Sequence, residues 1–243
     1  MMVWDSAHAR PLAVDGSYYL TALSQLNLAG MYPMKIAGGQ TEEGIVIGNT
    51  YDKYGTSNPV ARAMVQGFDK ALTRLVDKVA ADDIHEVGCG EGYWVTRWVK
   101  EGRNARGTDF SSQVIAMAQR HAEANAVDAS RFEVRSIYEV DEKQDSAPLV
   151  VCCEVMEHLE EPGRGLASLQ RIVQSDLILS VPREPLWRVL NMARGKYIGA
   201  LGNTPGHLNH WSKTQFVTFV GKYFDVVETL SPLPWTMLHC RRR

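Results

Sequence analysis

The sequence has few cysteines, and their spacing matches neither a C-x-x-C motif nor a disulfide framework. The 243 residues include four cysteines, at positions 89, 152, 153 and 240. Small secreted domains are rich in disulfides, whereas thiols in reducing compartments stay reduced. We therefore expect reduced thiols and a cytoplasmic protein.

A long apolar run and an excess of basic charge are also missing. The most apolar run, APLVVCC at 147–153, is too short to cross a bilayer, and charged residues occupy the N-terminal region where a signal peptide needs an apolar core. Lys and Arg together number 26, against 28 Asp and Glu. A nucleic-acid binder usually carries a basic field that neutralises phosphates. We therefore do not expect a nucleic-acid partner.

Short apolar runs alternate with helix-like stretches after residue 58. Asn58 and Pro59 fit the cap and the first position of a helix, and apolar residues then recur at helical spacing up to Val79. The predicted strands are 84–88, 105–110, 131–135, 148–153 and 176–181, and the predicted helices between them are 93–100, 111–126 and 163–173. Such alternation is typical of a parallel α/β sheet.

Two further runs, 224–230 and 235–240, are joined by SPLP, which is too short for a crossover helix. The fold class predicted is α/β: a Rossmann-like, mostly parallel seven-stranded sheet with helices on both faces and an antiparallel C-terminal strand pair. We expect residues 1–40 to form an N-terminal extension, with weak helical patterning at 18–28, and residues 41–243 to form the domain. Thirty residues, 182–211, exceed what a simple connection needs and predict a substrate-selecting cap.

The stretch EVGCGEG, residues 86–92, places glycines between a predicted strand and a predicted helix. Glycines there let the backbone approach a nucleotide-like ligand closely. A dinucleotide motif would need Gly or Ala where Tyr93 stands, and the acid Glu86 would repel a diphosphate, so an NAD-dependent oxidoreductase is disfavoured. Asp109 ends the second predicted strand, where a carboxylate can accept both hydroxyls of a ribose.

The segments EVGCGEG (86–92), TDFS (108–111) and VVCCEVMEHL (150–159) resemble those of class I S-adenosylmethionine-dependent methyltransferases, over roughly residues 50–240. The resemblance implies an enzyme that uses S-adenosylmethionine. Ser136 and Ile137 stand where this family often has an Asp, so a hydroxyl and the backbone would contact the adenine. By this resemblance the candidate cofactor-binding residues are Glu86, Gly88, Cys89, Gly90, Asp109, Phe110, Ser136, Ile137 and Glu154.

A second cluster, EVMEH at 154–158, follows the fourth predicted strand at the carboxyl edge of the sheet. If a helical turn begins at Glu154, then Glu154, Glu157 and His158 share one face and could hold a divalent cation. The segment 204–216 resembles the histidine segment of small-RNA 2′-O-methyltransferases, in which His207 would complete the metal set. The alternative is acid–base catalysis by Glu157, His158 and His207 without a metal, which we favour. His210 is expected only to pack within the cap.

The predicted function is transfer of a methyl group from S-adenosylmethionine to a small-molecule acceptor, on an oxygen atom because the second cluster supplies a base. Two alternatives stay open: a metal-assisted RNA 2′-O-methyltransferase and a nucleotide-binding module without turnover. Residues 183–201 mix apolar with basic side chains, and ubiquinone-pathway methyltransferases use a segment in this region for membrane contact, so peripheral membrane contact is a further expectation. The sequence predicts neither the acceptor's identity nor the oligomeric state.

Overall fold

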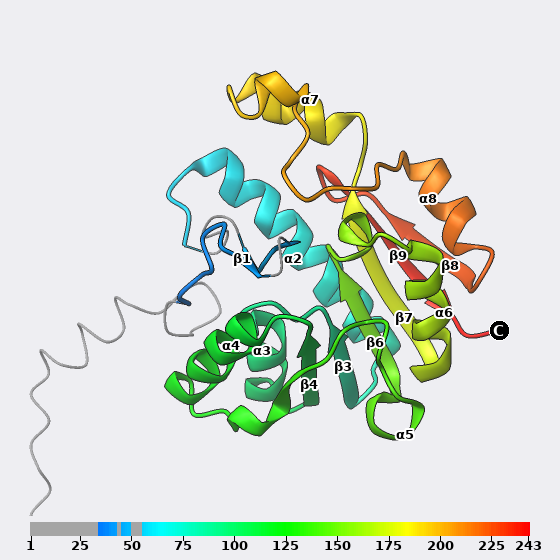
Figure 1. Cartoon of the computed structure of the whole chain (residues 1–243). Coiled ribbons are helices and arrows are strands. Elements are labelled where there is room, and N and C mark those ends of the chain that lie inside the picture. Colours follow the sequence, from blue (N-terminus) through cyan, green and yellow to red (C-terminus); the bar gives the residue numbers. More distant parts are fainter. Residues whose placement is uncertain (1–33, 43–44, 50–54) are drawn as a thin grey trace, which may run out of the picture.

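The computed structural model describes residues 34–42, 45–49 and 55–243, and the helical patterning predicted at 18–28 lies outside them. These residues form a central seven-stranded sheet with helices on both faces (Figure 1). Its strands are β3 (Asp83–Val87), β4 (Asn104–Asp109), β5 (Phe132–Val134), β6 (Ala147–Cys153), β7 (Val173–Pro182), β8 (Asp225–Leu230) and β9 (Trp235–Arg241).

The strand order across the sheet is β5-β4-β3-β6-β7-β9-β8. Strands β3 to β7 are parallel, whereas β9 runs antiparallel to both β7 and β8. The short SPLP link leaves room only for a turn between the last two strands. The predicted fold class, including the antiparallel C-terminal pair, is confirmed.

The helices of the described residues are α2 (Pro59–Val79), α3 (Tyr93–Lys100), α4 (Ser112–Ala124), α5 (Glu142–Asp145), α6 (Pro162–Ile172), α7 (Leu186–Ala193) and α8 (Lys213–Val220), with short 3₁₀ turns η1 (Ala129–Arg131), η2 (Met156–His158) and η3 (Ile198–Ala200). Side-chain caps mark the starts of α2, α4, α5 and α8. Asn58 Oδ1 accepts the Val60 and Ala61 N–H groups at 2.9 and 3.1 Å, which caps α2. Ser212 and Gln215 form a capping box at α8.

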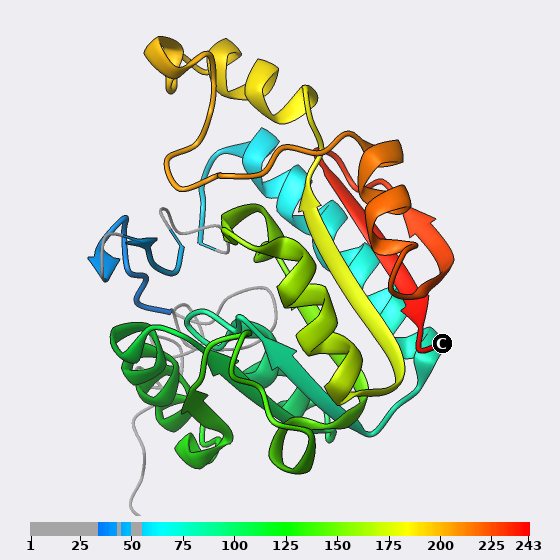
Figure 2. The same cartoon turned by 45° about the vertical axis from the view of Figure 1, so that its right-hand side comes forward.

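Two apolar layers cover the sheet. On one face α2, α3 and α4 pack against it, and on the other face α6 and α8 do (Figure 2). Successive side chains of β6 point to opposite faces of the sheet. Leu149 and Val151 pack in the layer with α2, α3 and α4, and Val150 and Cys152 pack in the layer with α6 and α8. All four are fully buried, and each such side chain contributes about 1.5–3 kcal/mol when removed from water.

The chain reverses its direction of progress across the sheet between β3 and β6. From β3 it proceeds outward through β4 to β5, and it then returns to β6 on the other side of β3. Open α/β sheets bind ligands at such a switch point, outside the carboxyl ends of the strands. The topology therefore places the ends of β3, β4 and β6 around one crevice.

Two segments outside the sheet border this crevice. The hairpin of β1 (Thr41–Glu42) and β2 (Ile45–Val46) lies near the N-terminus, and Ala37 and Ile47 beside it pack on Val114 of α4. At the other end, α7 projects from the end of β7 within the predicted cap 182–211 (Figure 1). None of the helices in the described ranges is both long and apolar enough to cross a membrane.

Candidate active site

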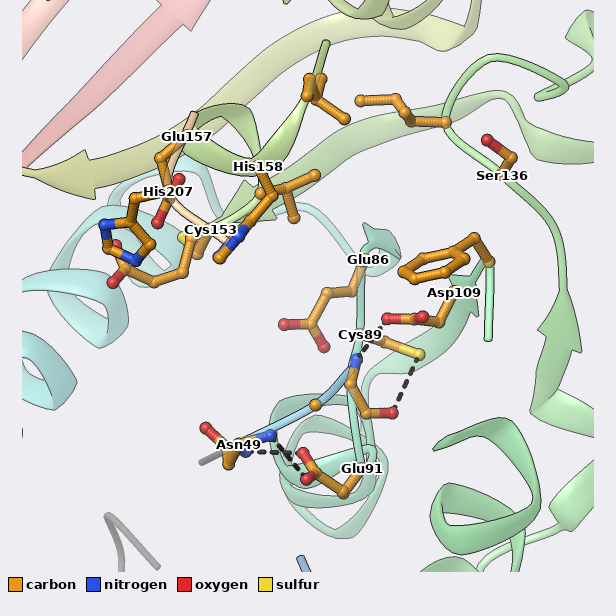
Figure 3. A pocket seen from close by; sticks show the side chains of 18 of the residues that line it. Asn49, Glu86, Cys89, Glu91, Asp109, Ser136, Cys153, Glu157, His158 and His207 are labelled. Carbon is orange, nitrogen blue, oxygen red and sulfur yellow. Dashed lines mark hydrogen bonds between the residues drawn. The ribbon is translucent and has the colours of Figure 1, made fainter. Parts of the chain in front are cut away.

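A cavity of about 680 Å³ opens at the carboxyl ends of β3, β4 and β6, within the usual range of small-molecule sites of about 300–1,000 Å³. All twelve site residues predicted from the sequence line it. Figure 3 labels Glu86, Asp109 and His158 among them. The twelve residues are Glu86, Gly88, Cys89, Gly90, Asp109, Phe110, Ser136, Ile137, Glu154, Glu157, His158 and His207. Their roles remain predictions, but their convergence on one cavity is a finding.

The three glycines between β3 and α3 meet different requirements. All have positive φ: 78° at Gly88, 54° at Gly90 and 78° at Gly92. A Cβ on Gly88 would lie 2.2 Å from Cγ2 of Val155, and one on Gly92 would lie 2.6 Å from Phe132, so these two positions serve tight packing. Nothing lies within 4 Å of a Cβ on Gly90, which leaves its backbone open to a ligand.

Asp109 is tied to this loop. Its Oδ2 accepts the Gly90 N–H at 3.1 Å, and its Oδ1 accepts the Ser111 N–H at 3.1 Å. Burial raises the pKa of Asp109 to about 6, while the two backbone donors act in the opposite direction. Hydrogen bonds from the two loops therefore hold the carboxyl group in place where it borders the cavity.

Glu86 occupies the middle of the crevice at the end of β3, and only 4% of it is exposed. Figure 3 shows its carboxylate between Asp109 and the histidine cluster. A buried carboxylate here favours a cationic ligand. Burial raises the pKa of the neighbouring Cys89 and Cys153 thiols well above the ordinary range, which disfavours the nucleophilic thiolate form.

Phe110, Ser136 and Ile137 border the opposite end of the cavity. Phe110 is 39% exposed, so its ring presents an apolar surface to a ligand. The Ser136 hydroxyl accepts the Tyr138 N–H at 3.3 Å, which leaves its own O–H group available as a donor. These residues could therefore border a flat, partly polar group such as a purine.

The second cluster assembles, but without Glu154. Ligand atoms of Glu157, His158 and His207 all lie within 4.8 Å of one another. Glu154 instead accepts the Trp235 Nε1–H at 2.6 Å and the Ser180 hydroxyl at 3.1 Å. The predicted shared face of Glu154, Glu157 and His158 is corrected: Glu154 has a left-handed φ of 59°, and η2 begins only at Met156.

The cap segment brings His207 to the cluster. The Glu157 carbonyl accepts the Leu208 and Asn209 N–H groups at 2.8 and 3.0 Å, which fastens the cap to η2. His158 Nδ1 donates to the Gly206 carbonyl at 2.9 Å, because a carbonyl can only accept. The neutral His158 ring then carries its lone pair on Nε2.

His207 lies edge to face against His158, with ring centroids 4.9 Å apart. Burial and the neighbouring His158 and His210 lower the pKa of His207 to about 3, so its ring is neutral at physiological pH. The Nε2 atom of His210 forms a 2.6 Å hydrogen bond with Asn203 Oδ1. His210 is not among the described residues that line the cavity.

Several cavity residues escaped the sequence analysis. The ring centroids of Trp187 in α7 and Trp235 in β9 are 5.8 Å apart, and those of Phe68 in α2 and Trp235 are 5.1 Å apart. These three rings give the cavity an aromatic wall. Glu91, in the glycine loop, and Asn49, which follows β2, also line the cavity. The Gly-rich EVGCGEG motif contained Glu91, but no signal in the sequence pointed to its partners.

Comparisons with known proteins agree with this architecture. Residues 84–176 match the family model described as "Methyltransferase domain". The chain is 25% identical over 161 residues to a ubiquinone biosynthesis O-methyltransferase of Methylococcus capsulatus, covering 60% of this chain and 65% of that protein. The match also covers 43% of a mitochondrial ubiquinone biosynthesis O-methyltransferase of Schizosaccharomyces pombe and 53% of a ubiquinone biosynthesis O-methyltransferase of Pseudomonas entomophila. The chain therefore spans less than two thirds of the length of each of these relatives.

Solved structures share the fold. Magnesium protoporphyrin IX methyltransferase from Synechocystis PCC 6803, with bound S-adenosylhomocysteine, is 20% identical with a TM-score of 0.58, over 78% of this chain and 90% of that one. The small RNA methyltransferase HEN1 is 19% identical with a TM-score of 0.57, over 72% of this chain and 25% of that one. Residues 84–176 therefore carry a methyltransferase domain, and the chain has the fold of class I S-adenosylmethionine-dependent methyltransferases.

Proposed function

We propose that this chain transfers the methyl group of S-adenosylmethionine to an oxygen atom of a small-molecule acceptor. The observation that carries the proposal is the arrangement of two groups in one cavity. The loop fixed by Asp109 and Gly90 lies at one end, and the Glu157, His158 and His207 cluster lies at the other. Relatives named as O-methyltransferases support the choice of oxygen.

The cofactor end of the cavity fits S-adenosylmethionine. Asp109 would accept the ribose hydroxyls, the open side of Gly90 would let the ligand approach the backbone, and Glu86 would attract the cationic methionine end. Phe110, Ser136 and Ile137 would border the adenine. Glu154 would act indirectly, since the Trp235 indole and the Ser180 hydroxyl already engage its carboxylate.

S-adenosylmethionine supplies an electrophilic methyl group: its S–CH₃ bond breaks as the O–CH₃ bond forms, and the electron pair remains on sulfur. The protein would align the acceptor with the methyl group and remove the proton of the acceptor's hydroxyl group. We assign the proton to Nε2 of His158, because the bond from Nδ1 to the Gly206 carbonyl leaves the lone pair on that atom. Glu157 and His207 would position the acceptor and His158.

The charges around the cavity favour a small, non-anionic acceptor over RNA. Its acidic lining residues are Glu86, Glu91, Asp109, Glu139, Glu154, Glu157, Glu160 and Glu161. Arg135 and Arg164 are the cationic ones among the described lining residues, and both form ion pairs with carboxylates. Phosphates would be repelled here, whereas the aromatic wall suits a planar hydroxylated molecule.

The cap offers a surface for peripheral membrane contact. Val189, Ile198 and Leu201 are 51 to 67% exposed, and Arg188 and Arg194 lie in the same segment. Apolar and basic side chains together suit an anionic lipid interface. Co-sedimentation with vesicles that contain anionic lipid tests this: binding that a Leu201→Asp variant loses supports it, and equal recovery in the supernatant with and without vesicles refutes it.

A metal-assisted 2′-O-methylation of RNA is the second candidate, and the Glu157, His158 and His207 cluster favours it. These three residues would hold a divalent cation, which would lower the pKa of the acceptor hydroxyl. Chelation separates the two candidates. It should abolish turnover if a cation is required and leave S-adenosylmethionine binding intact, whereas the favoured metal-free reaction survives it.

The experiment that tests the proposal is a transfer assay with methyl-labelled S-adenosylmethionine and a panel of catechols, simple phenols, amines and short RNA. Label on a hydroxylated small molecule supports the proposal. Label on the amines alone or on RNA alone contradicts it, and S-adenosylhomocysteine binding without transfer to any acceptor favours a non-catalytic module.

The four cysteines are all free, which supports our proposal of a cytoplasmic location.

A further inference from the structure

Glu91 is a buried carboxylate that accepts hydrogen bonds from two residues of one described N-terminal segment, Ala37 and Asn49. Only 1% of the residue is exposed. Its Oε1 accepts the N–H groups of Ala37 at 3.0 Å and of Asn49 at 2.7 Å, and its Oε2 accepts the Asn49 Nδ2–H at 2.6 Å. We call residues 34–42 together with 45–49 the strap. The side chain of Glu91 thus connects the glycine loop to the strap.

Three neutral donors satisfy this carboxylate without neutralising its charge. Within the described ranges, no Lys, Arg or His side chain forms an ion pair with Glu91. Removing a carboxylate from water is costly unless hydrogen bonds compensate, and hydrogen bonds to a charged group are worth about 1.5–3 kcal/mol each. The contact between Glu91 and the strap is therefore strong.

A second carboxylate fastens the strap further along. Glu42 accepts hydrogen bonds from the Ser111 hydroxyl and, at 2.8 Å, from the Ser112 hydroxyl, at the start of α4. These bonds lower the pKa of Glu42, and a negative charge suits the N-terminus of a helix. Ser111 also donates its N–H to Asp109. The strap is thereby attached to both loops that carry the candidate cofactor site.

The strap reaches into the cavity at Gly48 and Asn49, which line it together with Glu86 and Gly90. Figure 3 shows Asn49 beside Glu91, with dashed lines for the hydrogen bonds between them. Gly48 fits closely: it has a φ of 55°, and a Cβ there would lie 2.5 Å from Glu91 Oε1. A ligand seated between Glu86 and Gly90 would therefore touch the strap.

We propose that Glu91 is a positioning residue that holds Gly48 and Asn49 as a wall of the S-adenosylmethionine site, so that the strap retains the bound cofactor. The proposal rests on the proposed function for the identity of the ligand. Glu91 acts by holding the strap.

The test is the dissociation rate of S-adenosylhomocysteine from the full chain, measured by stopped-flow displacement with excess S-adenosylmethionine. Glu91→Ala removes all three bonds, and Gly48→Ala places a methyl group against the carboxylate. Both should release the ligand at least about tenfold faster, the equivalent of one lost hydrogen bond to a charge. Glu91→Gln keeps the shape and one acceptor oxygen for the Ala37 and Asn49 N–H groups, so it should restore part of the retention.

Glu123→Ala, an exposed glutamate on α4, is the matched control and should leave the rate unchanged. Should Glu91→Ala fail to fold, Asn49→Ala removes only the side-chain bond and decides the question together with Gly48→Ala. Wild-type dissociation rates in the folded Glu91 or Asn49 and Gly48 variants would overturn the inference. No binding of S-adenosylhomocysteine to the wild type would instead refute the proposed function itself.

Discussion

The backbone N–H of Gly90 donates a 3.1 Å hydrogen bond to Oδ2 of Asp109, which joins the loop after β3 to the end of β4. The bond brings together a backbone that is open to a ligand and a carboxyl group that borders the same cavity. In the proposed function both elements border the nucleoside of the bound cofactor. Ligand affinity should therefore respond sharply to either residue.

Asp109→Ala should weaken S-adenosylhomocysteine binding by about 2 kcal/mol, which is roughly 30-fold, because the ribose loses a charged acceptor. Isothermal titration calorimetry measures the change. Asp225→Asn, an exposed carboxylate that pairs with Arg243 on the surface, is the control and should bind as the wild type does. Equal affinity of the Asp109 variant and the wild type would show that the ribose lies elsewhere.

Substitutions at Gly88 and Gly90 should have separable effects. Gly88→Ala places a Cβ 2.2 Å from Val155 and should lower the free energy of unfolding by several kcal/mol. Gly90→Ala meets no atom and should cost only about 1–2 kcal/mol of stability for its positive φ, while it weakens ligand binding by obstructing the backbone.

Urea unfolding and calorimetry on both variants distinguish these effects. A Gly90 variant that binds S-adenosylhomocysteine normally would contradict the close approach of the ligand. A Gly88 variant as stable as the wild type would mean that Val155 moves aside without penalty.

His158→Ala should reduce methyl transfer by roughly two to four orders of magnitude if His158 removes the acceptor proton. The cofactor lies on the other side of Glu86 in the proposed arrangement, so the affinity for S-adenosylhomocysteine should change little. His210→Ala is the control, because His210 bonds Asn203 and lies outside the cavity lining. Full activity of the His158 variant, in chelator as well as without it, would leave alignment alone to explain the rate.

His85 should make stability depend on pH. This fully buried residue bonds the Asp145 carbonyl and Thr108 Oγ1 at 2.7 and 3.0 Å, and burial lowers its pKa from 6.5 to about 4. Between these values the unfolded chain binds more protons than the folded one, so the stabilising contribution is present above pH 6.5 and is lost as pH falls toward 4. From pH 7.5 to pH 5 the loss attributable to His85 should be about 2 kcal/mol.

The measurement is the difference in unfolding free energy between the wild type and His85→Gln at several pH values. Taking the difference removes the opposing contribution of Asp109, whose raised pKa favours the folded state at lower pH. A difference that is constant from pH 7.5 to pH 5 would mean that His85 titrates normally when folded.

The sequence predicted that Glu86, Gly90 and Asp109 lie together, but it misplaced Glu154. Glu86, Gly90 and Asp109 follow the ends of adjacent parallel strands, and topology alone brings such positions together. Helical spacing counted from Glu154 predicts that this residue shares a face with Glu157 and His158, but the helical turn begins only at Met156. The left-handed φ at Glu154 redirects it, and spacing cannot reveal such a backbone state.

Contacts between distant segments could not be predicted from the sequence, for a different reason. Asn49 and Glu91 are 42 residues apart, and their bond depends on how an irregular strap crosses the glycine loop. Trp187 and Trp235 meet only because the cap and the last strand converge. Periodicity predicts elements and their faces, whereas such encounters depend on tertiary packing.

Isothermal titration calorimetry of the wild-type chain with S-adenosylhomocysteine, and in parallel with NADH, tests the central claim most directly. The Glu86, Gly90 and Asp109 arrangement predicts stoichiometric binding of S-adenosylhomocysteine and no heat from NADH, since Glu86 would repel a diphosphate. Heat from NADH with none from S-adenosylhomocysteine would contradict it.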